Sequence, residues 1–381
     1  MGKLELIQEM PKKLGFGCMR LPIIGKETEN IDYDAFKEMI DSFMEQGFRY
    51  FDTAYPYHNE KSEEAVKKCL VERYKREDFF LADKMPVWLV KEEKDYAPIF
   101  ETQLERTGAG YFDFYLLHAL EKARFEFLEK TGGFEFVKKL KAEGKVKNIG
   151  FSFHDSAEVL EQILKAHPEM DFVQLQINYF DWDSDNVQSR ACYEVAEKYN
   201  MPVIVMEPVK GGTLANLIGE PAEILKELDP KASNASYAIR YAASLPNVMV
   251  VLSGMSNMAQ LQDNTSYMKD FEPLTAVEKE AIEKVRQELK KMATVGCTKC
   301  RYCVEGCPQK IMIPSVFAVY NMSMQFGVNP STIRQYNNVT NKEDGRGKAS
   351  DCIKCGKCEG HCPQHLEIRK LLEQISQTFE V

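Results

Sequence analysis

The sequence predicts a parallel (β/α)8 (TIM) barrel followed by a smaller, largely helical C-terminal domain. Between about residues 14 and 270, eight short apolar runs alternate with amphipathic helical stretches. No G-x-G-x-x-G turn follows any of these runs, which disfavours the alternative of a doubly wound open sheet. Eight of the eleven cysteines lie beyond residue 296. We therefore expect the barrel in residues 1–272, and a linker helix with a cysteine-rich domain in residues 273–381.

The apolar runs are the expected strands, and the stretches between them carry helix signals. Asp32 is a suitable N-cap for the first helix, and Gly47 is a suitable stop. The expected helices are Asp32–Gln46, Ser62–Tyr74 with an SEEA capping signal, Ser156–His167, Val187–Tyr199 and Asn234–Ser244. The expected strands are Leu14–Met19, Arg49–Thr53, Phe79–Asp83, Phe112–Leu117, Asn148–Phe153, Phe172–Ile177, Val203–Glu207 and Met249–Ser253.

Beyond the barrel, residues 274–292 form a charged amphipathic pattern that predicts a helix leading away from it. Ile313–Gln325 predicts a second helix, and the polar, glycine-containing stretch Asn337–Lys348 predicts a loop.

Composition and charge exclude several classes of protein. The 381 residues are 44% apolar and 28% charged, as is usual for a globular protein. The net charge is −9 and there is no basic stripe, so nucleic acid is not an expected partner. No apolar run reaches the ~18 residues of a membrane span, and the N-terminus lacks a signal peptide's apolar region. Free thiolates require a reducing compartment, so we expect a cytoplasmic protein.

Two cysteine runs share the pattern C-x2-C-x2-C-x3-C-P. This spacing is typical of [4Fe-4S] clusters, in which the fourth cysteine ligates the other cluster. Two zinc sites are the alternative, but zinc favours pairs of ligands rather than runs of four. The remaining Cys18, Cys69 and Cys192 are expected to be ordinary buried residues. The expected ligand sets are Cys297, Cys300, Cys303 and Cys362 for one cluster, and Cys352, Cys355, Cys358 and Cys307 for the other.

Four polar residues lie at or just beyond the ends of consecutive expected strands, where a barrel places its chemistry. They are Asp52, Tyr57, Lys84 and His118. Each alone is more often a structural or surface residue, but together they indicate one site at the barrel mouth.

On these residues the chain resembles the aldo-keto reductases. The matching features are FDTA with Tyr57, Lys84 and His118, together with the segment SYAIRYAASLPNVMVVLSGM. The resemblance covers about residues 12–270. Residues 294–366 resemble the two-cluster bacterial ferredoxins.

The resemblance implies a carbonyl reduction in which Tyr57 supplies the proton to oxygen. Lys84 would lower the pKa of Tyr57, and Asp52 would hold Lys84 by a charge-assisted hydrogen bond. His118 would orient the carbonyl oxygen. The substrate would be a small carbonyl compound or alcohol.

The resemblance also implies an extended nicotinamide dinucleotide across the barrel mouth. This chain differs at three contacts: Phe153 follows Ser152 where the family usually has Asn, Met206 replaces an aromatic residue, and Gln260 replaces a cation. The last difference favours NADH over NADPH, and the others leave room for a flavin. The implied contacts are Met19, Arg20, Ser152, Gln176, Met206, Pro208, Ser253, Gly254, Met255, Gln260 and Asn264.

We therefore expect an iron–sulfur oxidoreductase that interconverts a carbonyl and an alcohol with NAD(P)H, with electrons relayed by the clusters, or with both. The alternative is an electron-transfer protein whose barrel is a docking scaffold or binds a flavin. The clusters could also be structural. A ferredoxin or flavodoxin is an expected partner of the cations Lys299, Arg301, Lys354 and Lys357.

Overall fold

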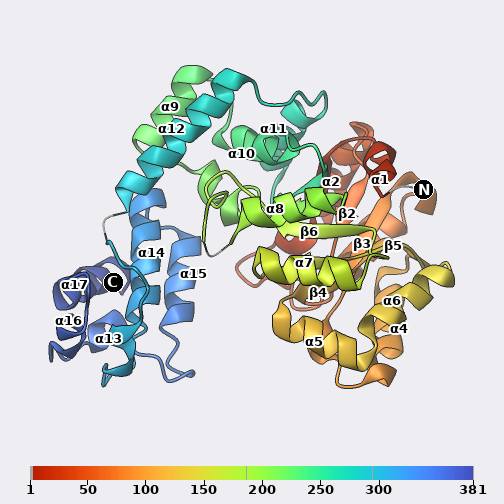
Figure 1. Ribbon diagram of the computed structural model, residues 1–381. Helices are drawn as coiled ribbons and strands as arrows, with labels where there is room; N and C mark the ends of the chain where they lie inside the picture. The colour runs from red at the N-terminus through yellow and green to blue at the C-terminus, as the bar shows by residue number, and fades with distance from the viewer. Residues whose placement is uncertain (1–2, 186, 294, 381) are drawn as a thin grey trace. The chain divides into compact units, whose positions relative to one another are not determined.

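The computed structural model describes residues 3–185, 187–293 and 295–380. Its N-terminal part is a closed barrel of eight parallel strands in sequential order, which confirms the predicted fold class (Figure 1). The strands are β1 (Leu14–Gly17), β2 (Tyr50–Asp52), β3 (Phe80–Met85), β4 (Phe112–Leu120), β5 (Val146–Phe153), β6 (Phe172–Gln176), β7 (Val203–Met206) and β8 (Val248–Ser253).

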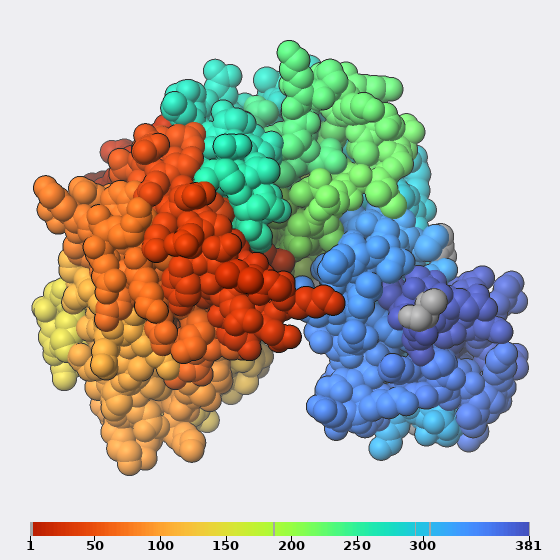
Figure 2. Space-filling view, turned by 180° about the vertical axis from the view of Figure 1, so that it is seen from behind, coloured from red at the N-terminus to blue at the C-terminus, as the bar shows by residue number. Residues whose placement is uncertain are grey.

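Helices surround the strands, and their apolar faces form the outer core. Asp32 Oδ1 accepts a hydrogen bond from Ala35 N at 3.0 Å, so the predicted N-cap is present. In the space-filling view, red and orange segments from the N-terminal part of the chain reach the surface of the barrel unit (Figure 2). The helices are α2 (Tyr33–Glu45), α3 (Ser62–Val66), α4 (Tyr96–Thr107), α5 (Lys122–Thr131), α6 (Gly133–Ala142), α7 (Ala157–Ala166), α8 (Ser189–Lys198), α10 (Asn234–Ala243) and α11 (Met258–Met268).

The predicted helix Ser62–Tyr74 is shorter than expected. It is α-helical through Val66 and then widens into a π-turn over Lys67–Val71. Ser62 does not cap it, because its hydroxyl bonds Thr53 Oγ1 at 2.9 Å and donates to Cys18 O at 3.2 Å. The hydroxyl thus joins this helix to the first two strand ends.

Side chains inside the barrel form two layers. The lower layer is aromatic: the Phe114 ring lies 5.2 Å from both the Tyr50 and the Phe172 rings. Gly15 makes room for it, since a Cβ there would lie 2.7 Å from Val250 Cγ1. Strand side chains alternate between faces, so residues two positions after Tyr50 and Phe172 also point inward. This places Asp52 and Gln174 in a polar layer above the aromatic one.

A short helix that the sequence analysis did not predict, α1 (Glu5–Glu9), precedes the barrel. Its Leu6 and the following Met10 are buried in the same cluster as Tyr50 and Phe114. The helix therefore extends the interior core with apolar side chains.

The chain divides into two compact units, one of residues 1–210 and 235–275, the other of residues 211–234 and 276–381. Residues 211–234 of the connection between β7 and β8 thus belong to the second unit, where α9 (Glu220–Leu228) packs against the predicted linker helix α12 (Ala276–Met292). The domain boundary after residue 272 remains a prediction.

The second unit is helical, with a core that includes Val316, Phe317 and Leu372. Helix α15 (Pro330–Val339) was not predicted, and it takes the first residues of the expected loop Asn337–Lys348. Its start is a capping box between Asn329 and Thr332. None of the described helices is long and apolar enough to cross a membrane. The other helices are α13 (Tyr302–Glu305), α14 (Ile313–Phe326), α15 (Pro330–Val339), α16 (Lys357–Gly360) and α17 (Ile368–Phe379).

Two buried tyrosines allow a matched test of how a hydrogen bond to a buried hydroxyl affects the stability of the barrel. The hydroxyl of Tyr50 has no hydrogen-bond partner, whereas Tyr115 Oη donates to Gln103 Oε1 at 2.6 Å. Tyr50→Phe should therefore be neutral or raise the apparent Tm, and Tyr115→Phe should lower stability by about 1 kcal/mol, or roughly 2–4 °C. Calorimetry of both variants measures the difference. Equal losses in the two would contradict this account.

Candidate functional site

A buried ion pair lies at the centre of the predicted constellation. Lys84 Nζ lies 2.5 Å from Asp52 Oδ1, and both side chains are at most 3% exposed. The ammonium also donates to Thr53 O at 2.7 Å. Gln174 Nε2 donates to the other Asp52 oxygen at 3.2 Å. Burial alone would lower the pKa of Lys84, but the charge of Asp52 raises it above its ordinary value.

Tyr57 is half-buried above this ion pair. Lys84 Nζ lies 5.0 Å from the centre of the tyrosine ring. Burial raises the pKa of the Tyr57 phenol, and the positive charge of Lys84 only partly offsets it. The predicted lowering by Lys84 is therefore present, but burial, which the sequence does not reveal, outweighs it and raises the pKa of Tyr57.

His118 completes the group on β4. Its ring lies 6.3 Å from the Tyr57 ring and 5.1 Å from Trp88. Burial, with the nearby Lys84 charge, holds the pKa of His118 well below its usual range, so the imidazole is neutral. Its Nδ1 is buried with no hydrogen-bond partner. The structure thus brings all four predicted residues together.

An unusual turn fixes the backbone beyond Tyr57. Three consecutive residues that are not glycine, His58, Asn59 and Glu60, have positive φ values of 53°, 50° and 66°. This conformation is costly for L-residues and persists only where other contacts hold it. His58 bridges Leu21 N at 3.0 Å and Thr28 O at 2.6 Å. Its adjacency to Tyr57 therefore reflects a structural role.

The expected dinucleotide contacts on the β1 and β8 sides lie close together. Ser256 Oγ donates to Arg20 O at 3.0 Å, and a Cβ on Gly254 would meet the Arg20 side chain at 3.0 Å. Met19 and Gly254 are exposed, whereas Met255 is buried in the outer core.

The start of α11 is pre-ordered. Asn264 Nδ2 donates to Ser253 Oγ at 2.7 Å. Gln260 is exposed, and its Oε1 accepts from Ser256 N at 2.8 Å. Asn257 caps the helix, whose first backbone N–H groups favour an anion.

The remaining expected contacts lie on β5, β6 and β7. Ser152 Oγ accepts from Ala119 N at 2.7 Å, so it ties β5 to the residue after His118. Gln176 lines a cavity with His154, Asp155 and other residues at the ends of β5 and β6. Met206 is half-buried and Pro208 is buried. That any of these residues touches a dinucleotide remains a prediction.

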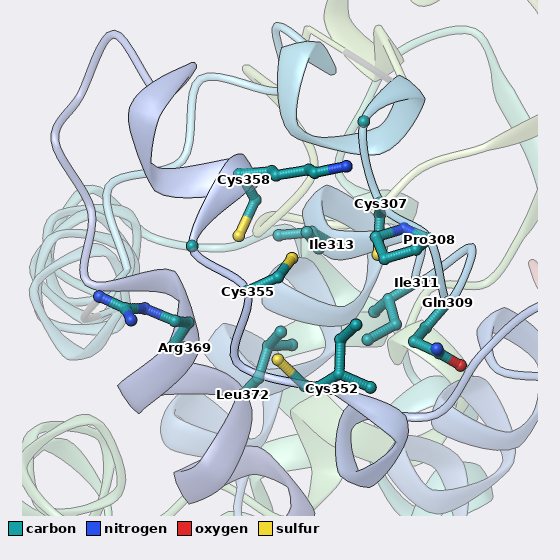
Figure 3. A pocket seen from close by; sticks show the side chains of 14 residues that line it. Cys307, Pro308, Gln309, Ile311, Ile313, Cys352, Cys355, Cys358, Arg369 and Leu372 are labelled. Carbon is teal, nitrogen blue, oxygen red and sulfur yellow. The ribbon is translucent and has the colours of Figure 1, made fainter.

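In the second unit the cysteines line two cavities. One, of about 330 Å³, is lined by Cys352, Cys355 and Cys358 of one loop and by Cys307. Figure 3 shows these three cysteines along that loop, with Cys307 and Pro308 on a neighbouring segment. The other cavity, of about 310 Å³, is lined by Cys297, Cys300, Cys303 and Cys362. These are the groupings that the spacing predicts.

The two cysteine loops share a backbone conformation. Lys299 and Lys354, which precede the middle cysteines, have φ values of 58° and 57°. The residues after those cysteines, Arg301 and Gly356, have φ values of 67° and 77°. Left-handed residues on both sides curl each loop around its cavity.

The cavities suit a group larger than one ion. Among the described residues, no three His, Cys, Asp or Glu side chains converge closely enough to hold a single metal ion. Mononuclear zinc requires four ligands at about 2.0–2.3 Å from one centre. Thiolates spread around a largely apolar cavity fit a cubane cluster instead.

Comparison with known proteins agrees with both units. The chain belongs to the aldo/keto reductase family, whose profile matches residues 13–287. Residues 296–366 match the 4Fe-4S dicluster domain. The chain is thus an oxidoreductase with an iron–sulfur domain.

The relatives are distant. A 9,11-endoperoxide prostaglandin H2 reductase of Trypanosoma cruzi is 26% identical over 284 residues, 73% of this chain and 89% of that protein. An aldo-keto reductase of Strobilurus tenacellus is 26% identical over 68% of this chain and 75% of its own length. The holo structure of a Bacillus halodurans aldo-keto reductase is 26% identical, with a TM-score of 0.56 over 72% of this chain and 91% of that one.

Sequence reasoning missed several residues of the site. Gln174 and the carbonyl of Thr53 bond the ion pair directly, and Trp88 lies beside His118. The sequence contained a signal for Gln174, because β6 carries Phe172, Gln174 and Gln176 at alternate positions. Polar residues that face the interior of a barrel rarely serve only to fill space. Trp88 lies in a single 3-10 turn, Val87–Leu89, which is too short for periodicity to indicate a direction.

Pairwise cysteine variants test how the ligands are shared. Cys300→Ala and Cys362→Ala should each lose about four of about eight irons, and the double variant should lose no more, because both residues line one cavity. Cys300→Ala with Cys307→Ala should lose nearly all iron. Iron and acid-labile sulfide are measured after anaerobic purification, with Cys69→Ala as the control. Additive loss in the first pair would contradict the grouping.

Proposed function

We propose that this chain interconverts a small carbonyl compound and its alcohol at Asp52, Tyr57, Lys84 and His118. The observation that supports this best is the buried ammonium of Lys84, which lies between a carboxylate at 2.5 Å and the ring of Tyr57 at 5.0 Å. A fixed positive charge beside a half-buried phenol favours proton exchange with an oxygen at the barrel mouth.

The chain's own residues supply the proton chemistry. Tyr57 donates its phenolic proton to the carbonyl oxygen and takes it back in alcohol oxidation. Lys84 remains charged throughout, because Asp52 and Thr53 O hold the ammonium. His118 is neutral and donates a hydrogen bond that orients the oxygen without adding charge. Asp52 is a positioning residue that keeps Lys84 in place.

A nicotinamide dinucleotide, when bound, supplies the hydride. The exposed residues Met19, Gly254 and Gln260 offer it a surface, and the start of α11 offers backbone donors for its phosphates. Because Gln260 is uncharged, we propose that NADH serves at least as well as NADPH. The half-buried Met206 also leaves room for a flavin ring.

The iron–sulfur domain supplies one-electron chemistry when it holds its clusters. We propose that it exchanges electrons with an acidic ferredoxin or flavodoxin and relays them to the reaction. Lys299, Arg301 and Lys357 are exposed next to the cysteine loops and match such a partner. Because the eight ligands need a reducing compartment, we also propose a cytoplasmic location.

Tyr57→Phe tests the proton donor. Carbonyl reduction should fall by roughly 10²–10⁴-fold while nucleotide binding stays nearly unchanged, because only the hydroxyl is lost. In the wild type, alcohol oxidation should accelerate as pH rises toward the raised pKa of Tyr57, since it requires the phenolate. Tyr55→Phe is the matched control. Unchanged kcat in Tyr57→Phe would show that another group is the acid.

Gln260→Arg tests the nucleotide site. A guanidinium at this exposed position should raise affinity for NADPH and leave affinity for NADH nearly constant, since only NADPH carries the 2′-phosphate. Titration of both nucleotides against the anaerobic wild type and the variant measures the ratio. A wild type with strong NADPH preference would refute the proposed choice.

A further inference from the structure

The backbone of Lys84 lies where a neighbouring strand ends. Strand β2 stops at Asp52, paired with Ala82, and Thr53 N donates to Ala82 O at 3.0 Å. Strand β3 continues through Met85. Along a parallel strand, successive residues direct their backbone N–H and C=O groups to opposite neighbouring strands. Lys84, two residues after Ala82, therefore directs both groups toward β2's side of the strand, beyond the point where β2 ends.

Side chains bind both of these groups instead. Asp83 Oδ1 accepts from Lys84 N at 2.8 Å. Gln103 Nε2, from α4, donates to Lys84 O at 3.0 Å. The backbone of Lys84 is therefore held by side-chain contacts rather than by the sheet.

These side chains belong to one buried network. Gln103 also donates to Glu63 Oε1 at 3.1 Å and accepts from Tyr115 Oη at 2.6 Å. This fixes the orientation of the Gln103 amide, since a flipped amide would set its oxygen against two acceptors. Arg106 Nη1 donates to Glu63 Oε2 at 3.2 Å.

Two carboxyl groups meet in this network. Asp83 and Glu63 are both 0% exposed, both belong to this network, and each is among the groups that perturb the other. Yet Asp83 Oδ2 has no donor. Two interacting carboxylates that are both buried would repel, so a proton shared by the pair accounts for both observations. Glu63 already accepts from Gln103 and Arg106, which leaves the proton on Asp83.

We infer that Asp83 and Glu63 share one proton, and that this neutral acid–carboxylate pair is the positioning element that fixes the backbone of Lys84. The inference rests on the proposed function for its catalytic consequence, because Lys84 acts there through Tyr57. Asp83 and Glu63 touch neither substrate nor nucleotide in this account.

The charges around the pair agree with a single shared proton. Lys84 belongs to Asp83's own strand, but its ammonium bonds Asp52 on the interior face. From α4, Arg106 faces Glu63 and also pairs with Glu60 at 2.8 Å. From β4, Tyr115 offers a neutral hydroxyl. Burial raises the pKa of both Asp83 and Glu63, in keeping with a retained proton.

The pH dependence of stability follows from this proton. Consider pH values above the ordinary carboxyl pKa, which is near 3.8 for Asp. At these pH values, a carboxyl whose pKa is raised in the folded state binds more protons in the folded state than in the unfolded state. Wild-type stability should therefore decline as pH rises from that value toward the raised pKa of Asp83. Asn at position 83 cannot lose a proton, so its stability advantage over the wild type should grow with pH.

Asp83→Asn and Asp83→Ala separate proton sharing from simple packing. Asn reproduces the protonated acid, accepting from Lys84 N and donating to Glu63, whereas Ala leaves both without a partner. In the anaerobic full-length holoprotein, Asp83→Asn should keep kcat within about twofold and keep the wild-type Tm or raise it. Asp83→Ala should lower kcat at least tenfold, with little change in nucleotide affinity. The expected upper size of the loss is ~10²-fold, which is the cost of displacing a catalytic group, here Lys84, by about 1 Å.

Asp113→Asn is the matched control. Asp113 is also buried on the barrel, but it pairs with two cations, Arg76 at 2.7 Å and Lys147 at 2.9 Å. Loss of its charge should lower Tm, unlike the same change at Asp83.

Two measurements do not depend on turnover. Infrared difference spectra with ¹³C-labelled aspartate should show a protonated carboxylic acid at neutral pH in the wild type, and this band should be absent in Asp83→Asn. The crystal structure of Asp83→Ala should show Lys84 displaced from Asp52. Absence of the acid band in the wild type, or an undisplaced Lys84, would overturn the inference. A wild type with both signatures but no carbonyl reduction would instead overturn the proposed function.

Discussion

The buried ion pair between Lys84 and Asp52 is the interaction on which the barrel's upper layer depends. It brings together side chains of β2, β3 and β6, since Gln174 bonds the second oxygen of Asp52 at 3.2 Å. Removing two charges from water is costly, and only close contact with further hydrogen bonds recovers that cost. Loss of either partner would leave an uncompensated charge at the barrel mouth. The ion pair therefore says little about the stability of the fold. It does indicate a defined geometry at the barrel mouth, which catalysis needs.

Unequal strand lengths create this geometry. Because β2 stops at Asp52 while β3 reaches Met85, the chain after β2 is free to leave the sheet and return over the ion pair with Tyr57. The departure has two consequences. The backbone beyond Tyr57 takes a left-handed turn that His58 holds in place. The backbone groups of Lys84, which β2 no longer pairs, require other partners, and Asp83 and Gln103 provide them.

Much of the architecture could be predicted from the sequence because it depends on local patterns. Apolar runs gave the eight strands, and their polar ends gave Asp52, Lys84 and His118. Long-range contacts were less accessible. Glu63 reads as part of a helix-capping signal and Asp83 as a strand end, and only the folded chain brings the two together. The net rise of the Tyr57 pKa was missed for the same reason, since burial depends on the whole fold. The start of α15 was missed although its Asn-Pro-Ser-Thr signal is local.

The two units meet opposite electrostatic demands with different devices. The barrel keeps the ammonium of Lys84 buried and charged, and Asp52 and Thr53 O accept its hydrogen bonds. The iron–sulfur domain keeps Cys300 and Cys355 exposed at the tips of curled loops, flanked by left-handed residues at equivalent positions. Exposure and nearby cations are among the factors that set the potential of a cluster, and they also give a redox partner access to it. Hydride chemistry benefits from exclusion of water, whereas single-electron exchange benefits from surface contact. Each unit therefore carries the burial pattern that its proposed chemistry requires.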